Sequence, residues 1–99
     1  MLTITLSSKI ELVKFIRNKF IGKNLYCIDV LSVIEGTVNF GVVENVDFAD
    51  DKVSIWGAES KVFWINLNDI INANINPKEK DVCLLIEAKN NVEVRFMLE

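Results

Sequence analysis

The chain has 99 residues, which is the usual length of one domain. Hydrophobic residues make up 51% and charged residues 25%, as in a folded globular protein rather than a disordered one. The net charge of −3 argues against binding of nucleic acid through bulk electrostatics, and the absence of histidine excludes histidine-based catalysis and histidine metal sites. We therefore expect a single domain over residues 1–99.

Cysteine usage and the N-terminus indicate the compartment. Cys27 and Cys83 lie inside apolar runs, which is typical of buried, reduced thiols. The first residues lack the positive region and cleavage site of a signal peptide, and no apolar stretch of the sequence reaches the roughly 18 residues that span a bilayer. These features predict a cytoplasmic protein that does not contact a membrane. Abundant asparagine, lysine and isoleucine favour AT-rich codons, and so a bacterium or one of its phages or mobile elements.

The N-terminal part predicts one helix over about residues 8–21. Ser8 and Glu11 have the spacing of a capping box, and Gly22 is placed to end the helix. Between them, apolar residues recur at helical spacing, at Leu12, Val13, Ile16 and Phe20.

A period of two predicts strands before and after this helix. The expected strands cover about residues 2–6, 25–34, 38–48, 53–57, 61–67, 71–75, 82–87 and 92–98. Many short strands at regular spacing favour antiparallel pairing. The predicted fold class is therefore α+β, mainly β, with one N-terminal helix plus a small barrel or strongly bent sheet of about six or seven strands.

Antiparallel register sorts residues 42–67 into two faces. If Phe48 pairs with Val53 across a tight turn at residues 49–52, Val46 faces Ile55 and every later pair is fixed. The core face is expected to carry Val42, Val46, Phe48, Val53, Ile55, Phe63, Ile65 and Leu67. The opposite face is expected to carry Val43, Asn45, Asp47, Ser54, Trp56, Val62 and Trp64.

Two tryptophans and two valines on the face away from the core have two interpretations. Either the helix, the N-terminal strand or the C-terminal hairpin packs over them, or they contact a partner, because aromatic residues are enriched at the centres of interfaces. The candidate partner-binding residues are Val43, Trp56, Val62 and Trp64, with Asp47, Asp50 and Asp51 near one hairpin tip. The acidic residues lack the spacing of a calcium loop, and they are typical of a soluble turn that can also meet a basic surface.

The predicted helix and its flanks are basic, with Lys9, Lys14, Arg17, Lys19 and Lys23 against Glu11 alone. On a helical wheel these cations scatter around the helix, as on a solvated face. The alternative is contact with phosphates through Lys14, Arg17, Lys19 and Lys23.

Catalytic motifs are absent from the sequence. It contains no G-x-S-x-G, P-loop or C-x-x-C pattern, and no base accompanies either cysteine. Asp29 is the one carboxylate inside an otherwise apolar strand. We expect neither an enzyme nor a bound cofactor or metal.

Residues 25–75 resemble the small Sm-like or SH3-like barrels. A long strand ends at Glu35-Gly36, the next carries Gly41 and Asp47 before an acidic turn, and Asn68-Asp69-Ile70 joins the last pair. Such segments are similar to barrels of YolD-like proteins and of ribosome-maturation factors, and the preceding helix matches the Sm layout. The arginine–glycine signature that helps Sm proteins to bind uridine-rich RNA has no counterpart at residues 71–75, so the resemblance does not imply RNA binding.

The function expected from these features is a non-enzymatic protein-binding module that occludes a host enzyme or assembles with itself. The alternative is an RNA- or DNA-associated barrel that uses the basic helix. The expected partner is therefore a protein or a second copy of the chain, ahead of nucleic acid.

Overall fold

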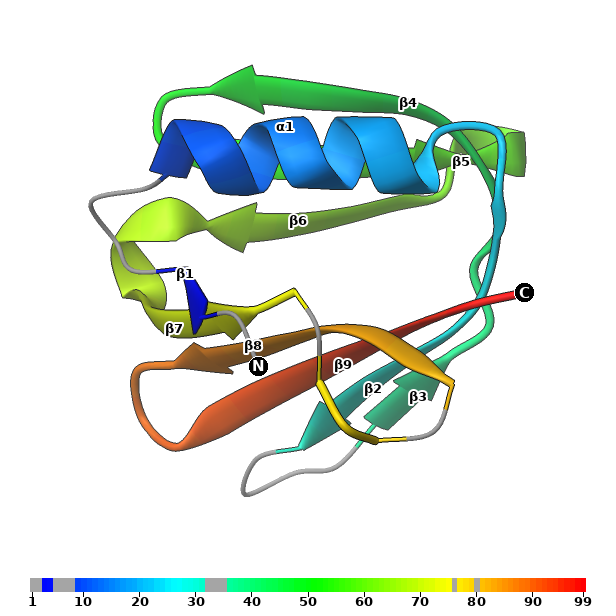
Figure 1. Ribbon diagram of the computed structural model, residues 1–99. Helices are drawn as coiled ribbons and strands as arrows, with labels where there is room; N and C mark the ends of the chain where they lie inside the picture. Colours follow the sequence, from blue (N-terminus) through cyan, green and yellow to red (C-terminus); the bar gives the residue numbers. More distant parts are fainter. Residues whose placement is uncertain (1–2, 5–8, 32–35, 76, 80) are drawn as a thin grey trace.

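The computed structural model describes residues 3–4, 9–31, 36–75, 77–79 and 81–99, which form one helix and a strongly bent sheet (Figure 1). The helix α1 spans Lys9–Phe20. The strands are β1 (Thr3–Ile4), β2 (Asn24–Leu31), β3 (Gly36–Val38), β4 (Gly41–Ala49), β5 (Lys52–Gly57), β6 (Val62–Asn66), β7 (Ile70–Asn74), β8 (Val82–Ala88) and β9 (Val92–Leu98). Short 3-10 turns, η2 (Ala58–Ser60) and η3 (Leu67–Asp69), flank β6.

The strands form one antiparallel sheet in the order β1-β7-β8-β9-β2-β4-β5-β6, and β3 pairs with β2 beside this path. The sheet bends around the core but is not closed, because β1 and β6 end the order in the described part of the chain. The predicted fold class is confirmed: mainly β, with one helix and a strongly bent sheet. The described residues form nine strands where six or seven were expected, and two of these, β1 and β3, are very short.

The C-terminal hairpin lies inside the sheet rather than on its surface. Strand β8 pairs with β7, and β9 pairs with β2, so the hairpin separates these two strands. Its turn, between the paired residues Ala88 and Val92, has Asn90 and Asn91 at positive φ of 64° and 59°, a conformation that asparagine adopts more readily than most residues. Residues 82–98 are therefore part of the sheet itself.

The single strand predicted over residues 38–48 is wrong. The chain leaves extended pairing at Asn39 and Phe40, and Gly41 has a φ of +97°, a conformation that side chains rarely adopt. Phe40 turns into the core, where its ring lies against Gly57 so closely that a Cβ there would meet it at 2.7 Å. This corner divides the segment into β3 and β4, and it lets β4 leave β2 and pair with β5.

The predicted faces of Val42 and Val43 are also wrong. Val42 was expected in the core and is 50% exposed, whereas Val43 was expected outside and is 1% exposed. The pairing of β4 with β5 shifts register between Val43 and Asn45, which is the signature of a β-bulge. One extra residue, Glu44, reverses the alternation before Val46, so the two valines exchange faces.

Beyond this bulge the predicted register is confirmed. Phe48 pairs with Val53 and Val46 with Ile55, and across the next turn Ile55 pairs with Phe63. The first turn is tight because Asp50 and Asp51 take positive φ values of 53° and 58°, as a type I′ turn requires.

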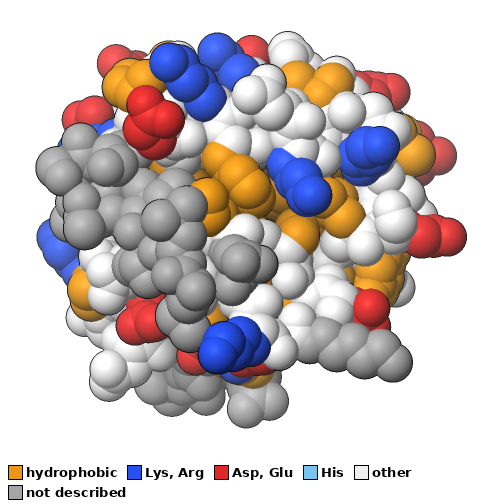
Figure 2. Space-filling model, in the orientation of Figure 1, with side chains coloured by type: hydrophobic (Ala, Val, Ile, Leu, Met, Phe, Trp, Pro, Cys, Tyr) orange, Lys and Arg blue, Asp and Glu red, His pale blue; other side chains and the backbone are white. Residues whose placement is uncertain are grey.

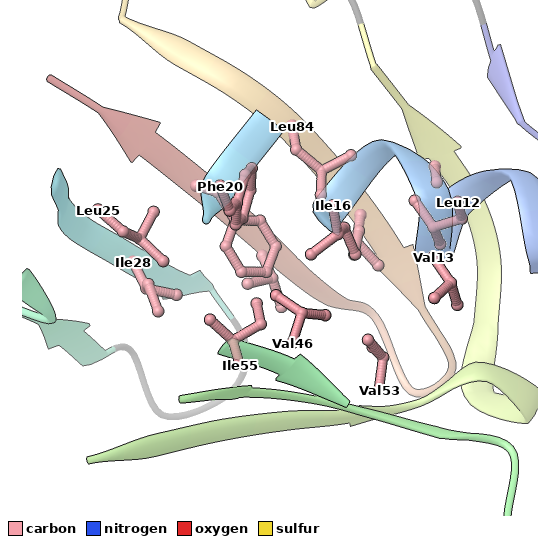
Figure 3. Packing of buried hydrophobic residues seen from close by; sticks show 14 of the residues in the cluster. Leu12, Val13, Ile16, Phe20, Leu25, Ile28, Val46, Val53, Ile55 and Leu84 are labelled. Atoms are coloured by element: carbon pink, nitrogen blue, oxygen red, sulfur yellow. The ribbon is translucent and has the colours of Figure 1, made fainter. Parts of the chain in front are cut away.

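Helix α1 fills the concave side of the bent sheet and supplies its apolar stripe to the core (Figures 1 and 3). The stripe consists of the four residues that the sequence predicted, Leu12, Val13, Ile16 and Phe20. Phe20 packs on Phe96 of β9 with ring centroids 5.6 Å apart. Gly22 ends the helix at a φ of +82°, as expected, and its N–H donates to the carbonyl of Val43. The expected capping residue, Ser8, lies outside the described residues.

The bulge gives a direct test in two adjacent valines. We expect Val43→Ala to lower the free energy of unfolding by about 2 kcal/mol, because it removes methyl groups from a packed core. Val42→Ala should change it by less than about 0.5 kcal/mol, since that side chain is half exposed. Urea unfolding of both variants measures the difference. The reverse order would show that β4 has no bulge.

Candidate functional site

The exposed side of β5 and β6 carries a cluster of large apolar side chains, which we call the tryptophan face: Trp56, Val62 and Trp64. Trp56 is 38% exposed, Val62 43% and Trp64 55%. Trp56 and Val62 are direct cross-strand partners, and Trp64 is the next outward residue of β6. These side chains therefore form one continuous surface.

Polar groups surround the tryptophan face in the sheet. Trp64 lies opposite Ser54, which lies opposite Asp47 on β4, and Asn45 lies opposite Trp56. The Lys52 ammonium sits 4.5 Å from the centre of a Trp64 ring, a cation–π contact. An apolar centre with a polar rim is the arrangement of protein–protein contact surfaces.

No described segment covers the tryptophan face. The C-terminal hairpin lies between β7 and β2, and α1 packs on the opposite, concave side of β4–β6. Of the two interpretations of these residues, the structure supports exposure in the described part of the chain. The prediction that Val43 belongs to the partner-binding residues is wrong, because the bulge turns its side chain into the core.

The three acidic candidates occupy different places. Asp47 lies on the outer side of β4, where its carboxylate accepts a hydrogen bond of 3.2 Å from the Asn45 amide. Asp50 and Asp51 form the β4–β5 turn, and Asn68 donates to the Asp51 carboxylate. Asp47 borders the tryptophan face, whereas the two turn residues are explained by the backbone conformation of the hairpin.

The basic candidates do not share one surface. Arg17 Nε donates to the carbonyl of Val46 at 3.1 Å, on the side of α1 that faces β4. Lys19 and Lys23 line a groove of about 570 Å³ on the side that faces β8 and β9. Lys14 is exposed on α1. The predicted phosphate-contacting set is thus divided between two sides of the helix.

That groove has an apolar floor, visible in Figure 2 as a hollow beside α1 with cationic side chains near it. Its described apolar lining is Phe15, Ile75, Pro77, Val82, Cys83 and Leu98. Asp81 and Glu99 line it as well, so both signs of charge are present. The sequence did not indicate this groove, because it joins residues of the helix to residues more than fifty positions later.

The sequence also did not indicate that β6 is an edge strand. In the described part of the chain β6 pairs with β5 alone. A groove of about 390 Å³ runs beside its free edge, between Phe63–Asn66 and apolar residues of the opposite layer, Val30, Ile86, Val92 and Val94. Which strand lies at an edge depends on the whole sheet order, which no local pattern encodes.

The described residues do not assemble a metal-binding cluster. No cluster of three or more cysteine or carboxylate side chains is positioned to hold a metal ion in those parts of the chain. The Cys27 thiol donates to the Asp29 carboxylate at 3.4 Å, and both side chains are half-buried. In the described segments, Arg95 makes ion pairs with Glu79 at 2.6 Å and Glu93 at 2.9 Å, and the first of these holds the pKa of Glu79 below its usual range.

Among the described residues, no helix is both long enough and apolar enough to cross a bilayer. Comparisons with protein-family models, with curated proteins and with solved structures found no match. The resemblance to Sm-like or SH3-like barrels therefore stays a prediction.

The two cysteines provide a test of thiol burial and reactivity. Burial raises the pKa of Cys83 to about 11, and burial together with the hydrogen bond to Asp29 raises the pKa of Cys27. The thiolate is the reactive form, so we expect Cys83 to alkylate at pH 8 roughly a hundredfold slower than a free thiol. Mass spectrometry after timed labelling measures this rate, and the denatured chain is the control. Rapid labelling of the folded protein would contradict the burial of this thiol.

Proposed function

We propose that the protein is a non-enzymatic protein-binding module and that the tryptophan face is its contact surface. The observation that carries this proposal is the exposure of two adjacent tryptophans and a valine on one sheet face. Exposed clusters of large apolar side chains mark interaction sites in soluble proteins more often than single exposed residues do. Tryptophan is also among the residues that dominate binding energy at interfaces.

The shape of this surface favours a protein partner. The face belongs to one side of β5 and β6 and borders two grooves: Trp64 lines the groove along the β6 edge, and Val62 lines one of about 300 Å³ with Val38 and Phe40. Small ligands are usually enclosed in a pocket, whereas a sheet face with a polar rim suits a protein surface. Such a module acts by covering part of its partner, for example the surface of a host enzyme, or by assembling with itself.

The alternative, an RNA- or DNA-associated barrel, has less support. A nucleic-acid interface needs cations that follow the phosphate backbone along one surface. Arg17 is directed to the carbonyl of Val46, while Lys19 and Lys23 lie near the opposite side of α1 with Asp81 and Glu99. The division of these charges favours the protein-binding function.

The first test is removal of one tryptophan. We expect Trp64→Ala to keep the fold, because the side chain is more than half exposed, and to weaken partner binding by about 2 kcal/mol, or roughly thirtyfold. Ile71→Ala is the matched control, since Ile71 is 51% exposed on β7, away from this face. Titration calorimetry with the purified partner measures the affinity, and circular dichroism confirms folding.

The partner is first isolated on tagged protein from a lysate of the source cells, with and without nuclease. A protein that survives nuclease and is lost with Trp64→Ala but not with Ile71→Ala supports the proposal. Recovery that depends on nucleic acid and falls steeply with added salt would favour the basic helix instead. Equal recovery by both variants would exclude the tryptophan face as the contact.

A further inference from the structure

Strand β6 presents free backbone groups along one edge. The N–H of Gly57 donates to the carbonyl of Lys61, and the N–H of Leu67 donates to the carbonyl of Asp51. In an antiparallel pair, alternate residues direct their backbone groups to the neighbouring strand. Phe63 and Ile65 therefore bond to β5, and the N–H groups of Val62, Trp64 and Asn66 point outward, with no partner among the described residues.

This edge lacks the usual protection against pairing. Natural edge strands carry lysine, proline or an inward charge that prevents the addition of another strand. The sequence of β6, Val-Phe-Trp-Ile-Asn, has none of these. The strand is also uncharged, so a second copy of itself meets no repulsion between like charges.

We propose that two copies of the chain join edge to edge through β6, antiparallel about a twofold axis at Trp64. Trp64 is the middle residue of the five, and its N–H and C=O both point outward. A twofold axis there pairs Trp64 with Trp64 and Val62 with Asn66 of the second copy, so that the carbonyl of Val62 accepts from the N–H of Asn66. Such an interface is self-complementary, as a closed dimer requires.

The charges that flank β6 favour the same arrangement. Lys61 precedes the strand and Asp69 follows it in η3, and both side chains are exposed. Antiparallel alignment brings Lys61 of each copy to the end of the strand where Asp69 of the other copy lies. Parallel alignment would instead place like charges together. Glu59, exposed in η2, lies at the same end and opposite Asp69 of the other copy, so each end holds one cation and two carboxylates. The flanking charges thus favour antiparallel over parallel alignment of a second copy.

The groove beside the edge adds an apolar contribution. Val30, Val92 and Val94 line it opposite β6, and they belong to the layer beneath the edge. In the dimer the grooves of the two copies lie side by side, which removes part of this apolar surface from water. An interface of one five-residue strand is small, so we expect a weak dimer rather than an obligate one.

This inference does not depend on the tryptophan face having a partner. Pairing through β6 uses main-chain groups in the plane of the sheet, whereas the tryptophan face points away from that plane. Trp56, on β5, is off the edge. The proposed dimer can therefore be disproved without disproving the proposed protein-binding function, and the reverse also holds.

The test compares two substitutions at one position. Asn66 has a φ of −82°, close to the value that proline requires, so Asn66→Pro removes the outward N–H with little strain in the monomer. Asn66→Ala keeps this N–H, and both variants lose the side-chain acceptor for the N–H of Asn68. Sedimentation equilibrium measures self-association, and thermal unfolding checks that both variants fold.

We expect the apparent mass of the unchanged protein to rise from 11.3 kDa toward twice that value between about 10 µM and about 1 mM. Asn66→Pro should weaken association by at least about tenfold relative to Asn66→Ala, because each copy loses one intermolecular hydrogen bond. Trp56→Ala should leave it unchanged. A monomer at every concentration, or equal association of the two Asn66 variants, overturns the proposal. So does loss of association in Trp56→Ala alone, which would place self-association on the tryptophan face.

A charge exchange tests the antiparallel alignment. Lys61→Glu should weaken the dimer at low salt, since three carboxylates then meet at each end of the paired strands. Adding Asp69→Lys to this variant should restore the affinity, because a lysine of the second copy then faces both carboxylates. Failure of the double variant to recover would contradict the antiparallel arrangement about Trp64.

Discussion

The structure depends most on the antiparallel register of β4, β5 and β6. Two tight turns set it: Asp50 and Asp51 at positive φ join β4 to β5, and Glu59 and Ser60 at φ values of 60° and 64° join β5 to β6. Because side chains alternate with a period of two, these turns decide which residues enter the core. A slip of one residue would bury the tryptophan face and expose Val53 and Ile55.

A bulge in β4 connects this register to the helix and to the rest of the core. The bulge near Glu44 returns Val43 to the core, where its backbone also bonds to Gly22 and Lys23 after the helix. Beyond the bulge, β4 has left β2, and Arg17 of α1 donates to the carbonyl of Val46 on this unpaired side. The helix therefore completes the side of β4 that no described strand occupies, and the core closes without closure of the sheet.

The sequence predicts the elements whose causes are local. The stripe from Leu12 to Phe20 and the glycine at position 22 place the helix, and the alternation from Val46 to Ile65 places three strands in register. The predictions fail where contacts between residues far apart in the sequence determine the local structure. Gly41 and Phe40 break a strand because Phe40 finds space against Gly57, and the bulge exchanges Val42 with Val43 to fill the core. The exposure of Trp56 and Trp64 had two interpretations in the sequence, since the positions of the helix, the N-terminal strand and the C-terminal hairpin in the whole fold decide between them.

The position of that hairpin also determines which strand is left at the edge. Strands β8 and β9 lie between β7 and β2, so they lengthen the sheet at the end opposite β6. As a result, no described strand pairs with the free edge of β6. One short strand then presents side chains on a face and main-chain groups on an edge, at right angles to each other. A partner on the face and a second copy on the edge do not compete for the same atoms. Pairing through β6 would join two tryptophan faces into one surface, so a dimer could hold a twofold partner with greater avidity than either copy alone.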